Sequence, residues 1–262
     1  MIRDSINERG MRAKMIKINC DLGERGADHP VDMALMKFIQ VANIACGGHA
    51  GDARSVSVFR RLADDNGVMT AAHLSYPDRK NFGRTSLKID PEALMESLDA
   101  QMQLVPDVKT VKFHGALYND SVVRRELADL LAGWARNHGI DLLIAPHDSE
   151  MAEACARQQI GLMAEAFAER RYTIDAATGR LRLVKRGKPF ASIHDTAEAI
   201  AQAERIASEQ KVAAIKDENE DVPSTEDVTI AAETICIHSD SAIALELARG
   251  LARLTGAQVS GS

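Results

Sequence analysis

Short apolar segments alternate with longer segments of helical periodicity along most of this chain. The apolar segments are rich in Val, Ile and Leu, and each is followed by a helical or loop segment. This alternation is typical of repeated βα units that form a parallel sheet. We expect seven strands, at Met15–Leu22, Val41–Gly47, Val68–Leu74, Thr110–Ala116, Ile140–Pro146, Gly161–Ala168 and Thr234–His238.

Two of the predicted helices have clear start signals. Asp90 and Pro91 provide an N-cap and a first-turn proline, and apolar residues then recur on one helix face. Asp52 is expected to cap a second helix, which ends at Gly67.

The length of 262 residues favours a single α/β domain, because no low-complexity linker separates two halves. We expect a frayed extension over residues 1–14, which are polar and of mixed charge, and one domain over residues 15–262. The two segments that break the βα rhythm are Glu169–Lys188, which is basic, and Lys216–Asp227, which is acidic. Both are predicted to be solvated surface loops, although the basic one follows a strand and could close over an anionic substrate.

Charge and hydropathy exclude several classes of partner. The chain has 32 Lys and Arg against 38 Asp and Glu, a formal net charge of −6, so it repels nucleic acids and anionic membranes. No apolar segment approaches the roughly 18 residues that span a bilayer, and the N-terminus has no signal-peptide core. The four cysteines form no CxxC pair, which indicates free thiols in a reducing cytoplasm.

Polar residues gather at the carboxyl ends of the predicted strands, where loops of parallel α/β proteins form active sites. Asn19, Asp21, Asn43, Lys112 and Glu165 lie on or directly after these strands. Five of the eight histidines have the same position, namely His49, His73, His114, His147 and His238. Such a cluster is difficult to explain by packing alone.

The cluster supports two kinds of chemistry, and the spacing does not decide between them. The side chains can hold a divalent metal that activates water, or they can act directly as general acids and bases. The absence of HExxH means that any metal site would be assembled from separate strands. A nucleophilic cysteine at Cys20, Cys46 or Cys236 is disfavoured, because small buried thiols are common in strands.

Several blocks of residues resemble, in order, the motifs of the LamB/YcsF family. They are NCDLGE at 19–24, ANIACGGHAGD at 42–52, AHLSYPD at 72–78, FGR at 82–84, HGALYN at 114–119, Glu165 with FAER at 167–170 and Tyr172, IHD at 193–195, and ICIH at 235–238. The resemblance runs from about Met15 to about Leu251, nearly the whole chain. It departs from the family pattern at Gly48, Leu74, Phe113 and Ser239, which adjoin the proposed site histidines.

The resemblance implies a seven-stranded parallel (β/α) barrel, similar to that of the glycoside hydrolases and polysaccharide deacetylases. It also implies the activity of the A component of a bacterial 5-oxoprolinase, which opens the lactam 5-oxo-L-proline to L-glutamate with ATP hydrolysis. The B and C subunits of that enzyme would be its partners. No GxxxxGK[ST] or GxGxxG motif is present, so ATP would be bound wholly or partly by these partners.

Within this hypothesis, Asp21 or Glu165 activates water, and the site histidines position water and transfer protons. The predicted catalytic residues are Asp21, His49, His73, His114, Glu165 and His238. The predicted substrate-binding residues are Asn19, Asn43, Arg84, Lys112, Tyr118 and Arg170, of which the basic ones hold carboxylate or phosphate. Two alternatives stay open, a stand-alone metal-dependent amidase or deacetylase and a lactam-binding assembly subunit without chemistry.

Overall fold

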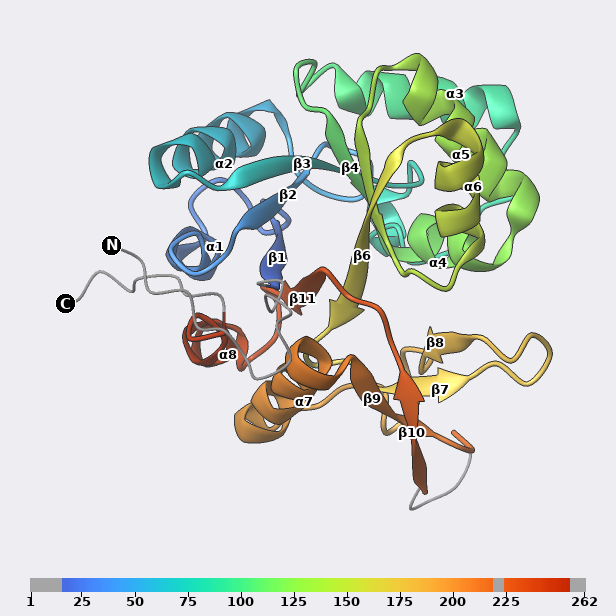
Figure 1. The fold of residues 1–262 in the computed structure, drawn as a ribbon. Helices are drawn as coiled ribbons and strands as arrows, with labels where there is room; N and C mark the ends of the chain where they lie inside the picture. Colours follow the sequence, from blue (N-terminus) through green and yellow to red (C-terminus); the bar gives the residue numbers. More distant parts are fainter. Residues whose placement is uncertain (1–15, 219–223, 255–262) are drawn as a thin grey trace.

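The structure of the chain, a computed structural model, describes residues 16–218 and 224–254. Its central feature is a closed barrel of seven parallel strands (Figure 1). Around the barrel these are β1 (Lys17–Leu22), β11 (Thr234–His238), β6 (Gly161–Phe167), β5 (Leu142–Ala145), β4 (Thr110–Phe113), β3 (Met69–Leu74) and β2 (Val41–Ala45). The predicted seven-stranded (β/α) barrel is therefore confirmed. The predicted extension at residues 1–14 lies outside the described residues, and the single-domain organisation of residues 15–262 stays a prediction.

All seven predicted strands are present, and Thr234–His238 has the predicted bounds. The largest difference is at β4, which ends at Phe113 because Gly115 begins the next helix with a left-handed φ of 57°. A Cβ atom at Gly115 would collide with the backbone carbonyl oxygen of Gly83. The close approach of these two loops, which flank His114, therefore requires glycine.

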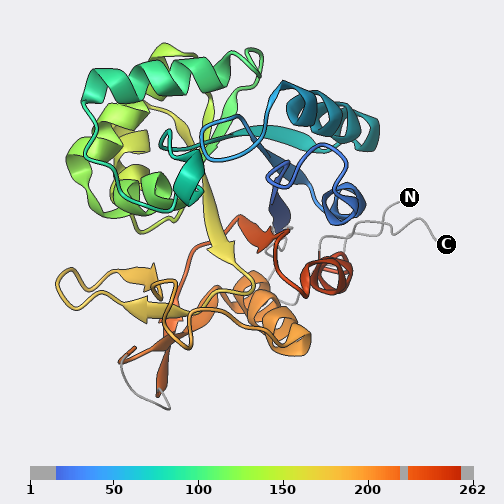
Figure 2. The same ribbon diagram turned by 180° about the vertical axis from the view of Figure 1, so that it is seen from behind.

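Helices flank the barrel on its outer side (Figures 1 and 2). Those described are α1 (Pro30–Leu35), α2 (Ala53–Asn66), α3 (Pro91–Met102), α4 (Gly115–Val123), α5 (Arg125–Asn137), α6 (Glu150–Gln158), α7 (Thr196–Glu209), α8 (Ala244–Leu251) and the short 3₁₀ helix η1 (Arg79–Asn81). Both predicted helix starts are confirmed. The Asp52 side chain accepts a hydrogen bond from the backbone of Ser55 at the start of α2, and Asp90 caps α3.

A second, four-stranded sheet lies between β6 and β11 in the sequence. Its strands, in spatial order, are β10 (Thr225–Thr229), β9 (Lys211–Ile215), β7 (Tyr172–Ile174) and β8 (Leu181–Leu183). In Figure 1 this sheet and α7 lie at one side of the barrel, past the end of β6. The seven predicted strands include none of these four.

The interpretation of the basic segment Glu169–Lys188 as a solvated loop is therefore wrong for its two strands, whereas residues 176–179 and 185–187 are exposed as expected. The segment forms the antiparallel hairpin β7–β8, whose strands are buried or half-buried, because β7 also pairs with β9. In the acidic segment, residues Thr225–Asp227 are exposed as expected, but they belong to strand β10 and not to a loop. Within residues 16–218 and 224–254, no helix has the length and apolar character needed to cross a membrane.

Candidate active site

The register of the barrel strands brings the predicted polar side chains together. Asp21 at the end of β1 pairs with His238 of β11 on one side and with Asn43 of β2 on the other. His73 of β3 lies beside Lys112 of β4. Residues far apart in the sequence thus become neighbours at the carboxyl end of the barrel, where (β/α) barrels carry their active sites.

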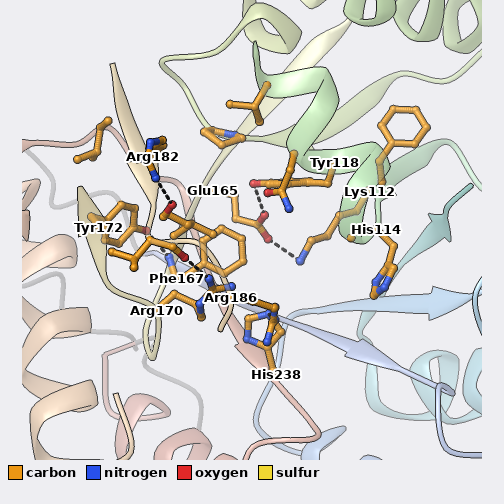
Figure 3. Close-up of a pocket in the computed structure, with 18 of the residues that line it drawn as sticks. Lys112, His114, Tyr118, Glu165, Phe167, Arg170, Tyr172, Arg182, Arg186 and His238 are labelled. Carbon is orange, nitrogen blue, oxygen red and sulfur yellow. Dashed lines mark hydrogen bonds and ion pairs between the residues drawn. The ribbon is translucent and has the colours of Figure 1, made fainter. Parts of the chain in front are cut away.

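A cavity of about 690 Å³ opens at this end of the barrel (Figure 3). This volume lies within the range of small-molecule binding sites. The predicted site residues that line it are Asp21, His73, Arg84, Lys112, His114, Tyr118, Glu165, Arg170 and His238. Asn19, Asn43 and His49 are not among the lining residues.

Lys112 is the centre of the ion pairs in the cavity. Its ammonium lies 3.0 Å from Asp21 Oδ1 and 2.8 Å from Glu165 Oε1. Burial opposes protonation of this lysine, but the neighbouring charges, that of Asp21 foremost, hold its pKa well above the ordinary value. Lys112 is therefore a permanent cation that joins two buried carboxylates.

Both carboxylate oxygens of Glu165 have a partner. Oε1 faces Lys112, and Oε2 accepts a hydrogen bond of 2.8 Å from the hydroxyl of Tyr118, as Figure 3 shows. Burial and the charge of Glu165 raise the pKa of Tyr118 well above its ordinary value, so its phenol stays a donor. These contacts fix Glu165 and leave it no free oxygen.

The hydrogen bonds to Asp21 from Asn43 and Lys112 both reach one carboxylate oxygen. This oxygen is Oδ1, and Asn43 also donates to Asn19 Oδ1 at 2.7 Å. The two asparagines are fully buried and do not line the cavity, so they position Asp21 rather than a ligand. Oδ2 of Asp21 lies 3.4 Å from His73 Nε2. Burial opposes ionisation of Asp21, but the charges of His73 and Lys112 outweigh it and hold its pKa well below the ordinary value.

Three histidines converge on Glu24, which follows β1. Glu24 Oε1 lies 2.9 Å from His49 Nε2, 3.3 Å from His114 Nδ1 and 3.7 Å from His73 Nε2. The rings of His49 and His114 are stacked, with centroids 3.6 Å apart. The donor atoms of these four side chains lie within 4.8 Å of one another, an arrangement that can hold a metal ion.

The electrostatics of this cluster favour neutral rings at His49 and His114. Burial, assisted by the charge of Asp21, raises the pKa of Glu24 to about 7. Burial also lowers the pKa of His49 and of His114, and the neighbouring imidazoles act in the same direction. A neutral imidazole is the form that accepts a proton or binds a metal.

His238 is oriented by a carboxylate that the predicted site did not include. Glu169 Oε1 accepts hydrogen bonds from the backbone nitrogen of His238 at 2.6 Å and from its ring Nδ1 at 2.8 Å. Because Nδ1 donates its proton, Nε2 carries the lone pair. That atom accepts a hydrogen bond of 3.2 Å from Arg186, in the loop after β8.

Two further arginines of the cavity wall have different environments. Arg170 is buried and donates to the backbone carbonyls of Ala191 and Val184. Burial, with the nearby charge of Arg186, lowers its pKa to about 10. Arg84 is half-exposed and pairs with Asp240 at 3.3 Å. Arg170 is thus a rigid part of the wall, whereas Arg84 can exchange its partner for an anion.

The cysteines have no nucleophilic character in this environment. Cys20, Cys46, Cys155 and Cys236 are free and buried. Burial raises the pKa of all four, that of Cys46 and that of Cys155 to about 12.

Glu24, Glu169 and Arg186 are the site residues that the sequence prediction missed. Glu24 and Glu169 stand inside the motif blocks 19–24 and 167–170, where each is the only glutamate. Arg186 lies in the basic segment, for which the charge pattern predicts exposure to solvent. No local signal places it in the cavity, because the two strands of the hairpin have three residues each and Leu181–Leu183 contains no β-branched or aromatic residue.

The departure at Gly48 has a local explanation. A Cβ atom there would collide with the side chains of Gln101 and Ser75. Gln101 Oε1 accepts a hydrogen bond from the backbone nitrogen of Ser75 and fills the space beside Gly48. A large side chain at this position therefore has no room in this chain.

Similarity to a solved structure supports this architecture. The structure is similar to that of the lactam utilization protein from Thermus thermophilus, with a TM-score of 0.75 and 28% sequence identity over 92% of this chain and 96% of that chain. A family 4 carbohydrate esterase from Streptomyces lividans gives a TM-score of 0.39 at 10% identity, over 92% of this chain and 87% of that chain. The model of the LamB/YcsF family matches residues 16–260. Because this match extends over nearly the whole sequence, the chain belongs to the LamB/YcsF family.

Proposed function

We propose that this chain is the component of an ATP-dependent 5-oxoprolinase that opens 5-oxo-L-proline to L-glutamate, in complex with partner subunits B and C. Membership of the LamB/YcsF family supports a role in lactam utilization. So does the similarity to the Thermus thermophilus protein, whose name states lactam utilization.

The observation that carries this proposal is the composition of the cavity. Buried carboxylates, an oriented histidine and the arginines Arg84, Arg170 and Arg186 line it. The substrate 5-oxoproline is a small anion, and its phosphorylated form carries more negative charge. Arginines bind carboxylate and phosphate groups in a fixed geometry, so a wall with three arginines suits such a substrate. The arginines provide local positive charge although the whole chain has a net charge of −6.

An unstrained lactam is a poor electrophile, which explains the need for ATP. Transfer of the γ-phosphoryl group of ATP to the lactam oxygen makes the ring carbon electrophilic and releases ADP. Water then adds to this carbon, and protonation of the ring nitrogen allows the C–N bond to break. The resulting acyl phosphate reacts with a second water to give glutamate and phosphate.

We propose that His238 is the group that moves these protons. His238 lines the cavity, and Glu169 fixes its ring through Nδ1, as a general base requires. Its Nε2 lone pair accepts from Arg186 here and would turn to water when Arg186 binds the anionic substrate instead. His238 would take a proton from water and return it to the ring nitrogen. Asp21 Oδ2 is the second candidate base, whereas both oxygens of Glu165 are engaged by Lys112 and Tyr118.

The partners would supply the phosphoryl group. The sequence has neither of the two glycine-rich nucleotide motifs sought above. In this arrangement the B and C subunits activate the lactam and this chain hydrolyses it.

The test is glutamate release from 5-oxoproline, measured with the purified chain alone and with the complex that it captures from its host extract. We expect release only with the complex, only with ATP, and with loss of release in a complex rebuilt with His238→Ala. Release by the chain alone without ATP would support an amidase that acts independently. A complex that binds 5-oxoproline and keeps full turnover with His238→Ala would support a lactam-binding role without chemistry.

A further inference from the structure

The rings of His73 and His114 are held in defined tautomers by backbone carbonyls. His73 Nδ1 lies 3.1 Å from the carbonyl oxygen of Lys112, and His114 Nε2 lies 3.0 Å from that of Phe82. A carbonyl oxygen only accepts hydrogen bonds, so each of these nitrogens carries a proton. In a neutral ring the other nitrogen then carries a lone pair.

The two lone pairs face each other. His73 Nε2 and His114 Nδ1 are 3.0 Å apart, and Oε1 of Glu24 lies 3.7 Å and 3.3 Å from them. Oδ2 of Asp21 lies 3.4 Å from His73 Nε2 on the same side. Four electron-rich atoms therefore converge in a buried space, which is repulsive unless a cation lies between them.

The spacing of the donor atoms fits a metal ion of the size of Zn²⁺. Bonds of about 2.0–2.2 Å at tetrahedral angles place neighbouring ligand atoms about 3.3–3.6 Å apart. Glu24 Oε1 lies 2.9 to 3.7 Å from the nearest ring nitrogens of the three histidines. The distance from His73 Nε2 to His114 Nδ1 is 3.0 Å. A cation could occupy this space with only small shifts of the side chains.

The surroundings have the features that hold metal ligands in place. Donation of the second ring nitrogen to a carbonyl oxygen is the usual support for a metal-bound histidine, and both His73 and His114 have it. The ligands come from separate segments: Glu24 follows β1, His49 follows β2, His73 lies near the end of β3 and His114 is the N-cap residue of α4. All three rings are buried, with exposed fractions of 7% or less.

We propose that Glu24, His73 and His114, with His49 Nε2 as a fourth donor, bind one divalent first-row transition ion of the Zn²⁺ type. Imidazole nitrogens with one carboxylate are the ligands that such ions prefer. The site stands on these contacts alone and does not depend on which lactam, if any, is the substrate. It borders the cavity, where a bound metal would acidify water or polarise a carbonyl oxygen.

The second group of possible ligands, Asp21, Cys236 and His238, is less suitable. Lys112 lies 3.1 Å from Cys236 Sγ, and burial keeps this thiol protonated by raising its pKa. The ring Nδ1 of His238 is engaged by Glu169. The substitution Cys236→Ser alters this second group only, so its effect on metal binding distinguishes the two groups.

The experiment is a calorimetric titration of ZnCl₂ into the chelator-treated chain, without ATP, substrate or partner subunits. We expect one equivalent to bind with a Kd at or below about 1 μM. Glu24→Gln, which keeps the side-chain shape, and His114→Ala should weaken binding by about 100-fold or more. Cys236→Ser and the control His138→Ala, at the end of α5, should bind as the unaltered chain does.

Cobalt provides a measurement that a general loss of folding would not imitate. Co²⁺ in a site of nitrogen and oxygen ligands should give visible absorption bands. These bands should be absent in the Glu24→Gln variant, whose circular dichroism spectrum should equal that of the unaltered chain. Absence of saturable Zn²⁺ binding at about 100 μM would overturn the proposal and indicate that a shared proton joins the two rings. Equal loss of binding in Cys236→Ser would also overturn it. Because no turnover is measured, failure to bind metal would leave the proposed lactam hydrolysis untouched. Failure to release glutamate would likewise leave the proposed metal site untouched.

Discussion

One carboxylate oxygen of Glu169 accepts hydrogen bonds from both the backbone nitrogen and the ring Nδ1 of His238, at 2.6 and 2.8 Å. This double contact fixes the end of β11 and the direction of the imidazole together. The Nε2 atom is left facing Arg186 and the cavity. The ring therefore has the orientation and tautomer of a general base before any substrate binds.

Replacement of His238 by alanine should remove this base. We expect kcat of the assembled enzyme to fall by about 100-fold or more, because general acid–base groups contribute that much. KM for 5-oxoproline should change little, since the ring acts on the reacting atoms. Steady-state glutamate release with ATP in excess measures both constants.

Glu169→Gln tests the orienting contact separately. The amide keeps the shape of the side chain but lacks the charge that holds Nδ1–H, so kcat should fall by about 10-fold and its pH profile should shift. The matched control is Glu96→Gln on the exposed face of α3. A Glu169→Gln enzyme with the turnover and pH profile of the control would remove His238 from the proposed role.

Arg186→Met should affect binding more than chemistry. Its guanidinium lies in the cavity wall, 3.2 Å from His238 Nε2, and no carboxylate pairs with it in the described ion pairs. We expect KM for 5-oxoproline to rise by about 10-fold with a smaller change in kcat, because the charge binds ground state and transition state alike. Arg61→Met, on the exposed side of α2, is the control. A fall in kcat at constant KM would instead make Arg186 a catalytic group.

The barrel could be predicted from the sequence, and nine of the twelve predicted site residues line the cavity. Strands buried on both sides, such as β2 and β11, read as apolar segments, and helix caps such as Asp52 have a local chemical signal. The side chains at the strand ends meet because every parallel strand ends at the same rim. Asp21, His73 and His238 illustrate this rule.

The β7–β8 hairpin and the contacts that it makes could not be predicted in the same way. Its strands have three residues each and draw their stability from pairing with β9, which lies far along the chain. The roles of Asn19 and Asn43 were also beyond the sequence pattern, since alternation places both inside the barrel but does not say which atoms they hold. Glu24 was visible in its motif, but only the loop geometry brings it to the three histidines.

The buried thiols give a prediction about reactivity. Burial raises the pKa of Cys46 and that of Cys155 to about 12 and also raises those of Cys20 and Cys236. Since the thiolate is the reactive form, the native chain should not react with DTNB at about pH 8, and all four cysteines should react in denaturant. Rapid modification of one thiol in the native chain would reopen the hypothesis of a nucleophilic cysteine.

Lys112→Met should destabilise the fold more than any exposed lysine substitution. Its ammonium lies within 3.0 Å of carboxylate oxygens of both Asp21 and Glu165, and its side chain is 3% exposed. Methionine fills a similar volume but leaves two buried carboxylates without their cation, which costs about 3–5 kcal/mol of unfolding free energy. Lys109→Met, an exposed position next to β4, should stay within about 0.5 kcal/mol of the unaltered chain. Urea unfolding of the three proteins gives these values, and equal midpoints for the two variants would mean that Asp21 and Glu165 need no ammonium between them.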